Sequence, residues 1–304
     1  MGHTSGVEDA QELEWRIYSV SDLRAPGRLR SIGVAIESDP DFRPTIAART
    51  FPPKRRLKAS FADYTAALES RFDPNEAEGW FTERDITPRG RGEVLLMDKG
   101  RLGQRLPHTM DGGVVDVGWF ESAEYFERMA SYLERVADCV GAFYGYCALN
   151  LMVLQRVRLL KKNAVTWLGR LSGVGRGMED LARELPDVYW WNYFGPAYVE
   201  RWGDRLKTVG VKRTTTPGGA MAIWATETPF VFDPRARRLD SYEWKRTFYE
   251  ALGEDVFMRE GQRQREPGEV VPSLGPQSPP VKARLLPRVV VLRDAAPLDE
   301  PDDA

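Results

Sequence analysis

Alternating apolar and polar positions predict two strands near the start of the chain. The first spans Trp15 to Val20, after a polar N-terminal stretch. The second spans Leu29 to Glu37, because Ile32, Val34 and Ile36 recur at every second position. Side chains with this period share one face of a strand. We therefore expect both segments to belong to a half-buried sheet.

Two later segments have the three- and four-residue apolar spacing of amphipathic helices. Ser60 is expected to cap the first helix, which continues to Phe72 and is ended by Asp73-Pro74. Ser122 is expected to cap the second helix, whose apolar stripe consists of Phe126, Met129, Leu133, Val136 and Val140.

Short apolar strands are predicted at 93–97, 114–119 and 143–148, the first two on either side of a glycine-rich connection. From the second strand onward, this half then has the order strand, helix, strand, strand, helix, strand. That order is typical of ferredoxin-like, split β-α-β sheets.

A similar order follows in the C-terminal half. A strand at 188–193 precedes a helix at 196–202, and strands at 211–215 and 220–226 form a hairpin across Thr216-Pro217-Gly218-Gly219. A last helix is expected from Tyr242 to Leu252, with Asp240 or Ser241 as its cap and Gly253 as its end.

These elements predict an α+β protein with antiparallel or mixed sheets, helices packed on one side, and two ferredoxin-like halves whose sheets are shared or abut. The N-terminal half covers 1–148 and the C-terminal half 187–258. The connecting segment 149–186 includes Leu149 to Leu171, whose apolar positions fit both a helix and a strand, with helix slightly favoured. The remainder, 259–304, is a Pro/Gly-rich extension with one short strand and an acidic tail.

The charge balance excludes the usual signature of a nucleic-acid-binding domain. Forty-three basic residues face 45 acidic ones, a formal net charge of -2. The small basic clusters at 54–56 and 161–162 fit a solvated surface, so nucleic acid is not an expected partner. No apolar run approaches the ~20 residues of a membrane span, and no signal peptide is recognisable. We expect a cytoplasmic protein without a membrane partner; its oligomeric state is open.

Catalytic groups are scarce. The chain has two cysteines, Cys139 and Cys147, in apolar surroundings that favour inert thiols. Of its two histidines only His108 is internal, and it is expected in a polar surface loop. No catalytic triad, zinc site or calcium loop has the required spacing, so we expect no enzyme activity and no cofactor.

One alternative interpretation is a metal-dependent nuclease. Asp233 followed by Glu243-Trp244-Lys245 resembles the metal-holding carboxylates and lysine of restriction-endonuclease-like enzymes. That chemistry needs Glu243 and Lys245 on one face of a strand, whereas the surrounding pattern predicts a helix, on which residues two apart diverge.

The densest feature is an aromatic segment at 187–200, which a Gly-Pro step divides. Large aromatic residues favour a strand before Gly195, and Pro196 suits the first turn of a helix. The rings either fill a core or partly form a contact surface. On the second interpretation, the partner-binding residues are Trp191, Tyr193, Tyr198 and Glu200.

The run from Tyr189 to Glu200, followed by Gly203, resembles a signature of bacterial immunity proteins from polymorphic toxin systems, in particular immunity protein family 52. The hairpin with Glu227-Thr228-Pro229-Phe230 and the closing helix with Leu252-Gly253 follow in similar order. The resemblance covers roughly residues 187 to 257. It implies a small cytoplasmic protein that blocks a cognate protein toxin and has no catalytic residues.

The sequence therefore favours a non-enzymatic immunity protein that binds a toxin. The alternatives are a metal-dependent nuclease-like or other phage-defence component, and a scaffold subunit of a bacterial complex. The toxin and the binding face are not specified by the sequence.

Overall fold

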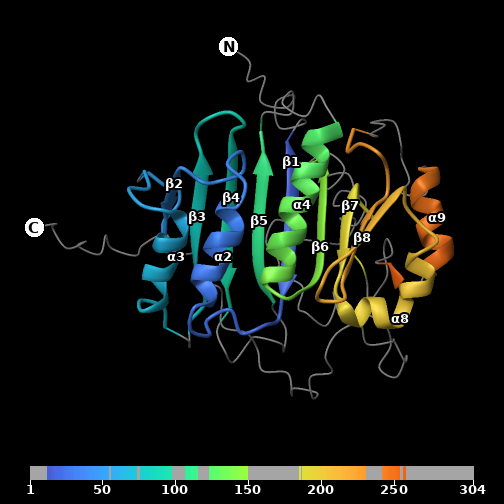
Figure 1. The fold of residues 1–304 in the computed structure, drawn as a ribbon, viewed down its shortest axis with the longest axis horizontal. Coiled ribbons are helices and arrows are strands. Elements are labelled where there is room, and N and C mark those ends of the chain that lie inside the picture. The colour runs from blue at the N-terminus through green and yellow to red at the C-terminus, as the bar shows by residue number, and fades with distance from the viewer. Residues whose placement is uncertain are drawn as a thin grey trace, which may run out of the picture.

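A computed structural model describes residues 12–54, 56–73, 76–97, 107–115, 123–149, 185, 187–230, 242–253 and 256–257. Within these residues, nine strands form one antiparallel sheet and five helices pack around it, which is an α+β fold (Figure 1). The strand order across the sheet is β2-β3-β4-β5-β1-β6-β7-β9-β8.

The elements have the following bounds. The strands are β1 (Leu13–Ser19), β2 (Ile46–Ala48), β3 (Glu78–Arg84), β4 (Gly90–Leu96), β5 (His108–Val114), β6 (Ala142–Leu149), β7 (Trp191–Phe194), β8 (Lys212–Thr215) and β9 (Met221–Trp224). The helices are α2 (Arg28–Glu37), α3 (Phe61–Glu69), α4 (Ala123–Cys139), α8 (Pro196–Leu206) and α9 (Glu243–Leu252).

The two halves share one sheet, and β6 is the strand at which they meet. In the N-terminal half, β1 lies beside the antiparallel pair β5 and β4; in the C-terminal half, β7 lies in the same way beside β9 and β8. β6 pairs with β1 on one side and with β7 on the other. The split β-α-β order expected from the sequence is therefore present twice, and β2 and β3 extend the first half at its edge.

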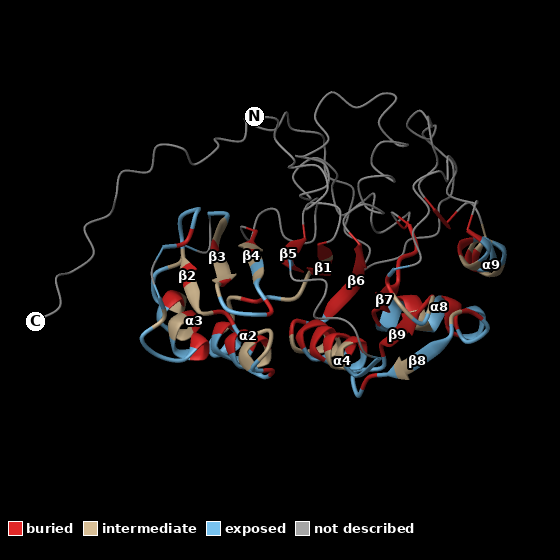
Figure 2. Ribbon diagram, turned by 90° about the horizontal axis from the view of Figure 1, so that it is seen from above, coloured by how far each residue is buried: buried red, intermediate tan, exposed pale blue. Residues whose placement is uncertain are grey.

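Helices cover opposite faces in the two halves. α2, α3 and α4 lie on one side of the sheet (Figure 2). Trp15 of β1 points to that side and its ring packs edge-on to Tyr132 of α4, with centroids 6.3 Å apart. Tyr144 of β6 points to the other side, where its ring lies 6.3 Å from Tyr198 of α8. Helices therefore lie on both faces of the shared sheet, so the expected packing on one side holds within each half but not for the sheet as a whole.

The segment Leu29 to Glu37 is a helix, so the predicted strand is wrong. Its apolar residues satisfy a second period: Leu29, Ile32, Gly33 and Ile36 are buried at helical spacing. Gly33 lets α2 approach α3 closely, because a Cβ there would lie only 2.6 Å from the Cα of Ala62. Packing of α2 on α3 therefore overrides the alternation of the β-branched residues.

Of the strand expected at 114–119, Val114 is the last residue of β5, which begins at His108, and 116–119 lie outside the described residues. Gly112 lies inside this strand, where a Cβ would come 2.4 Å from the indole of Trp15. Gly113 makes similar room for Glu12, whose carboxylate would lie 2.2 Å from a Cβ at that position. Glycines weaken a strand signal, yet here they admit side chains across the sheet.

His108 is the first residue of β5 and is buried, so the expected position in a surface loop is wrong. Its Nδ1 accepts a hydrogen bond of 2.8 Å from the backbone N–H of Met97. β2 and β3 were missed altogether: their polar and glycine residues give no clear alternation.

Several local predictions are confirmed. Ser60 caps α3 by accepting a hydrogen bond of 3.0 Å from Asp63 N–H, although the helix ends at Glu69 rather than Phe72. The apolar stripe of α4 is buried, and the strand at 143–148 is β6. The hairpin β8–β9 forms as expected. α9 ends at Gly253 with φ 96, but Tyr242 occupies the N-cap position instead of Asp240 or Ser241.

Predictions for 150–184, for Asp233 and for 259–304 fall outside the described residues. In the part of the chain that the structure describes, no helix combines the length and apolar character needed to cross a membrane.

Candidate functional site

The aromatic corner is part of the core. Trp191 and Tyr193 of β7 and Tyr198 of α8 are 0%, 1% and 0% exposed. Only Glu200, on the outer side of α8, is exposed among the four predicted partner-binding residues. The core interpretation of the three rings is therefore the one that this structure supports.

Gly195 explains the sharp corner. Its N–H donates a hydrogen bond of 2.9 Å to the carbonyl of Phe143 in β6. A Cβ at Gly195 would lie 2.6 Å from the carbonyl oxygen of Ala142, so only glycine permits this approach. Pro196 then begins α8 at its first turn. The strand, corner and helix predicted from the sequence are confirmed.

A buried ion pair joins α9 to the segment before β7. Lys245 Nζ donates to Asp187 Oδ2 at 2.6 Å, and the two side chains are 1% and 0% exposed. Asp187 Oδ1 accepts hydrogen bonds of 2.7 Å from Tyr249 Oη and from Val188 N–H. Buried charges require such partners, because an isolated charge in the core is very costly.

Aromatic rings surround this pair. The Lys245 ammonium lies 5.6 Å from the ring centroid of Tyr189, 5.8 Å from that of Tyr242 and 5.3 Å from that of Trp244. These distances are within the range of cation–π attraction. The lysine is thus held between a carboxylate and several rings, an arrangement that fixes α9 against the core.

The nuclease-like constellation does not assemble among the described residues. Lys245 is buried, whereas the side chain of Glu243 is 88% exposed on the other side of α9. Asp233 falls outside the described residues. In the described ranges, no group of three or more His, Cys, Asp or Glu side chains is placed to hold a metal ion.

A second polar cluster lies on the sheet face away from α2, α3 and α4. We call it the charged sheet face; it consists of Glu12, Glu14, Arg16, Arg91, Glu93 and Asp111. The strand register accounts for it, because Glu93 pairs with Asp111, and Asp111 pairs with Arg16, in a single row across β4, β5 and β1. Figure 2 shows no described helix on this side of β2–β5.

Two ion pairs organise the charged sheet face. Arg16 Nε donates to Asp111 Oδ1 at 2.5 Å, with side-chain exposures of 10% and 19%. Arg91 binds Glu12 with two hydrogen bonds, of 2.9 Å from Nε and 2.5 Å from Nη2. Bidentate pairs of this kind have fixed geometry. Arg16 Nη1 is buried and has no hydrogen-bond partner in the structure as described.

The carboxylates of this face are harder to ionise than usual. Burial raises the pKa of Glu14 to about 7, against the opposing effect of Arg16. Burial also raises the pKa of Asp111, and burial together with the charge of Asp111 raises the pKa of Glu93. A positive charge brought to this face would lower these pKa values, since it favours the ionised forms.

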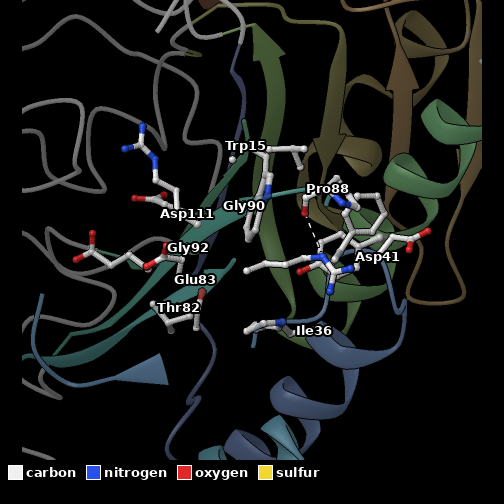
Figure 3. Close-up of a pocket in the computed structure, with 18 residues that line it drawn as sticks. Trp15, Ile36, Asp41, Thr82, Glu83, Pro88, Gly90, Gly92 and Asp111 are labelled. Atoms are coloured by element: carbon white, nitrogen blue, oxygen red, sulfur yellow. Dashed lines mark hydrogen bonds between the residues drawn. The ribbon is translucent and has the colours of Figure 1, made fainter. Parts of the chain in front are cut away.

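A small cavity lies beside the paired strands β4 and β5, next to their glycines. In Figure 3, Trp15 stands between Asp111 on one side and Pro88 and Asp41 on the other. The cavity has a volume of about 50 Å³. Pockets for small organic ligands have volumes of about 300–1,000 Å³. The cavity therefore has room for water rather than for an organic substrate.

The remaining reactive side chains have shifted pKa values that suppress reactivity. Burial lowers the pKa of His108 to about 4, so its imidazole is neutral at pH 7. Burial raises the pKa of the thiols of Cys139 and Cys147, which keeps both protonated. The expectation of inert thiols agrees with these environments.

Comparison with known proteins gives a fold neighbour. No protein-family model and no curated protein matches the chain. A solved structure of similar fold is titled Pseudomonas aeruginosa T6SS protein PA0821. It matches with a TM-score of 0.55 and 12% sequence identity, over 85% of this chain and 77% of that chain. At this identity the likeness concerns the fold.

Proposed function

We propose that this chain is a non-enzymatic immunity protein, which binds a cognate bacterial toxin and neutralises it in the cytoplasm of the producing cell. A fold shared with a T6SS protein is compatible with a toxin-related role. The resemblance of residues 187–257 to immunity protein family 52 points to the same class of function.

The charged sheet face is the observation that carries this proposal. It is a partly exposed array of acidic and basic side chains, most of them on strands whose backbones are paired on both sides. A contact surface on a sheet loses little conformational entropy when it binds, because its side chains are already positioned. Complementary charge also increases the rate and the specificity of protein association.

The aromatic corner supports binding indirectly in this proposal. Trp191 and Tyr193 are packed in the core on the α4 side of the sheet, with ring centroids 6.1 Å apart. On the other side, the ring of Tyr198 makes tilted contacts with those of Phe194 and Trp202, and the contact with Phe194 attaches α8 to β7. Glu200 is then a second, independent candidate for a partner contact on the outer side of α8.

Growth rescue tests the proposed function. The protein encoded beside this chain's gene is expressed in a bacterial host, alone and together with this chain. We expect growth arrest in the first case and normal growth in the second, with the two purified proteins eluting as one complex in gel filtration. Glu200→Lys tests the α8 contact, with Glu250→Lys on α9 as the matched exposed control.

Two results would contradict the proposal. The first is a neighbouring protein that stays toxic, or does not co-elute, when this chain is present at equal amounts. The second is hydrolysis of nucleic acid by the purified chain with added Mg²⁺, which would favour the nuclease-like alternative.

A further inference from the structure

We propose that the charged sheet face binds an extended segment of the partner protein that carries arginine or lysine side chains. This inference rests on the proposed function and specifies the chemistry of the toxin surface. It commits to a cationic peptide segment rather than a nucleic acid, a metal ion or a second copy of this chain.

The charge on this face favours a cationic partner. Its carboxylates, Glu12, Glu14, Glu93 and Asp111, outnumber its guanidinium groups, and Glu83 lies opposite Arg91 at its border. Each guanidinium already binds one carboxylate: Arg16 binds Asp111 and Arg91 binds Glu12. Glu14 and Glu93 thus remain as the acceptors available to an incoming cation. Phosphate backbones would be repelled by the same groups.

The guanidinium of Arg16 is a further feature that points to a ligand. Arg16 is 8% exposed as a whole residue, and its Nη1 lacks a hydrogen-bond partner in the described structure. Its guanidinium lies on the charged sheet face, since its Nε binds Asp111 of the neighbouring strand. An unpaired buried donor is costly, so a ligand that supplies an acceptor is favoured. A peptide carbonyl is such an acceptor, and a bare metal cation is not.

The groups along one cross-strand row follow an order that suits a peptide. Phe81 pairs with Glu93, Glu93 with Asp111, and Asp111 with Arg16. Phe81 also contacts Phe51, a ring that is 72% exposed, with centroids 5.4 Å apart. The row therefore offers an aromatic surface for an aliphatic stem, a carboxylate for its charged end, and a donor for a carbonyl.

These groups can bind the backbone and a side chain of one peptide at the same time. The cationic side chain would pair with Glu93 or Glu14, while a backbone carbonyl of the same segment would accept from Arg16 Nη1. Neither a simple cation nor a simple anion satisfies both ends of the row.

A hexa-arginine peptide serves as the probe, with a hexa-glutamine peptide as its uncharged control. Binding to the full chain is measured by fluorescence anisotropy at pH 8 and low salt. We expect Glu93→Gln to weaken hexa-arginine binding about tenfold, and Glu14→Gln to act in the same direction. Glu124→Gln, an exposed change on α4 at the opposite side of the sheet, should leave the affinity unchanged.

Arg16→Lys tests the donor. It keeps a positive charge beside Asp111 but removes the guanidinium Nη1, so the affinity should fall although the net charge is the same. Thermal melts identify variants that fail to fold, and Asp111 is left intact because it neutralises Arg16. Equal binding by wild type, Glu93→Gln and Glu124→Gln would overturn the inference. So would preferential binding of a single-stranded oligonucleotide.

The growth assay separates this inference from the proposed function. If wild type and Glu93→Lys rescue growth equally, the charged sheet face is not the contact and the antidote function stands. If wild type fails to rescue while hexa-arginine still binds as expected, the face recognises cationic peptides and the antidote function is wrong.

Discussion

Lys245 and Asp187 are 58 residues apart in sequence, yet their side chains meet at 2.6 Å inside the core. Tyr249, one turn further along α9, donates to the same carboxylate. The last helix is therefore attached to the segment before β7 by charge as well as by apolar packing. This contact gives a structural role to the lysine that a nuclease-like mechanism would need for catalysis.

Replacing Lys245 should destabilise the fold strongly. Lys245→Met leaves Asp187 buried beside its hydrogen-bond donors without the ammonium, and removal of one member of a buried pair typically costs about 3–5 kcal/mol. The free energy of unfolding is measured by urea denaturation. Glu243→Gln, at an exposed position two residues earlier, should stay within about 0.5 kcal/mol of wild type.

The double variant Asp187→Asn/Lys245→Met isolates the interaction. Its destabilisation should be clearly smaller than the sum of the two single effects, because the second change removes a charge that the first left unpaired. Additive effects would mean that the two side chains do not stabilise each other.

Two glycines in helices should respond in opposite directions to alanine. Gly33→Ala places a Cβ 2.2 Å from Thr65 Oγ1 and 2.6 Å from Ala62 Cα, so α2 must move away from α3, at a cost of about 1–3 kcal/mol. Gly203→Ala in α8 meets only Val199 Cγ1 at 3.4 Å and should gain about 0.5–1 kcal/mol of helix stability. Melting temperatures of the two variants check the pair, and an unchanged or raised melting temperature of Gly33→Ala would refute the close α2–α3 approach.

Acid should destabilise the protein through His108. Its pKa is about 4 in the fold and 6.5 in the unfolded chain, so between these values the unfolded chain binds the proton and the folded protein does not. The free energy of unfolding then falls as pH falls through this window, by at most about 1.4 kcal/mol per pH unit. His108→Gln, which keeps an acceptor for Met97 N–H, should flatten this part of the profile. A wild-type slope in that variant would show that other groups cause it.

Glu14 should have the opposite dependence on pH. Its pKa is about 7 in the fold against 4.5 for the free group, so the folded protein holds the proton more tightly. The stability from its neutral form is present below pH 4.5 and is lost as pH rises to about 7. Glu14→Gln should therefore exceed wild type in stability at pH 8, by about 1–2 kcal/mol after allowance for partial exposure. Glu124→Gln supplies the exposed comparison and should show no such gain.

The sequence by itself determined the elements whose signals are local. Ser60 and Gly253 fix helix ends through their own backbone and side-chain chemistry, and the Gly195-Pro196 step fixes the corner. The amphipathic stripe of α4 leaves only one face that can be buried. Such features depend on neighbours within a few residues, so the chain specifies them before it folds.

Tertiary structure decided what depends on distant partners. The segment at 29–37 fits both periods, and only the close contact of Gly33 with α3 selects the helix. The glycines of β5 favour a loop by local pattern. In the fold, Trp15 occupies the space beside Gly112 and Glu12 the space beside Gly113. The pairing of Asp187 with Lys245, and the row from Phe81 to Arg16, follow from the sheet register and helix docking. No local pattern encodes a register between strands far apart in the chain, because cross-strand neighbours are set by the packing of the whole sheet.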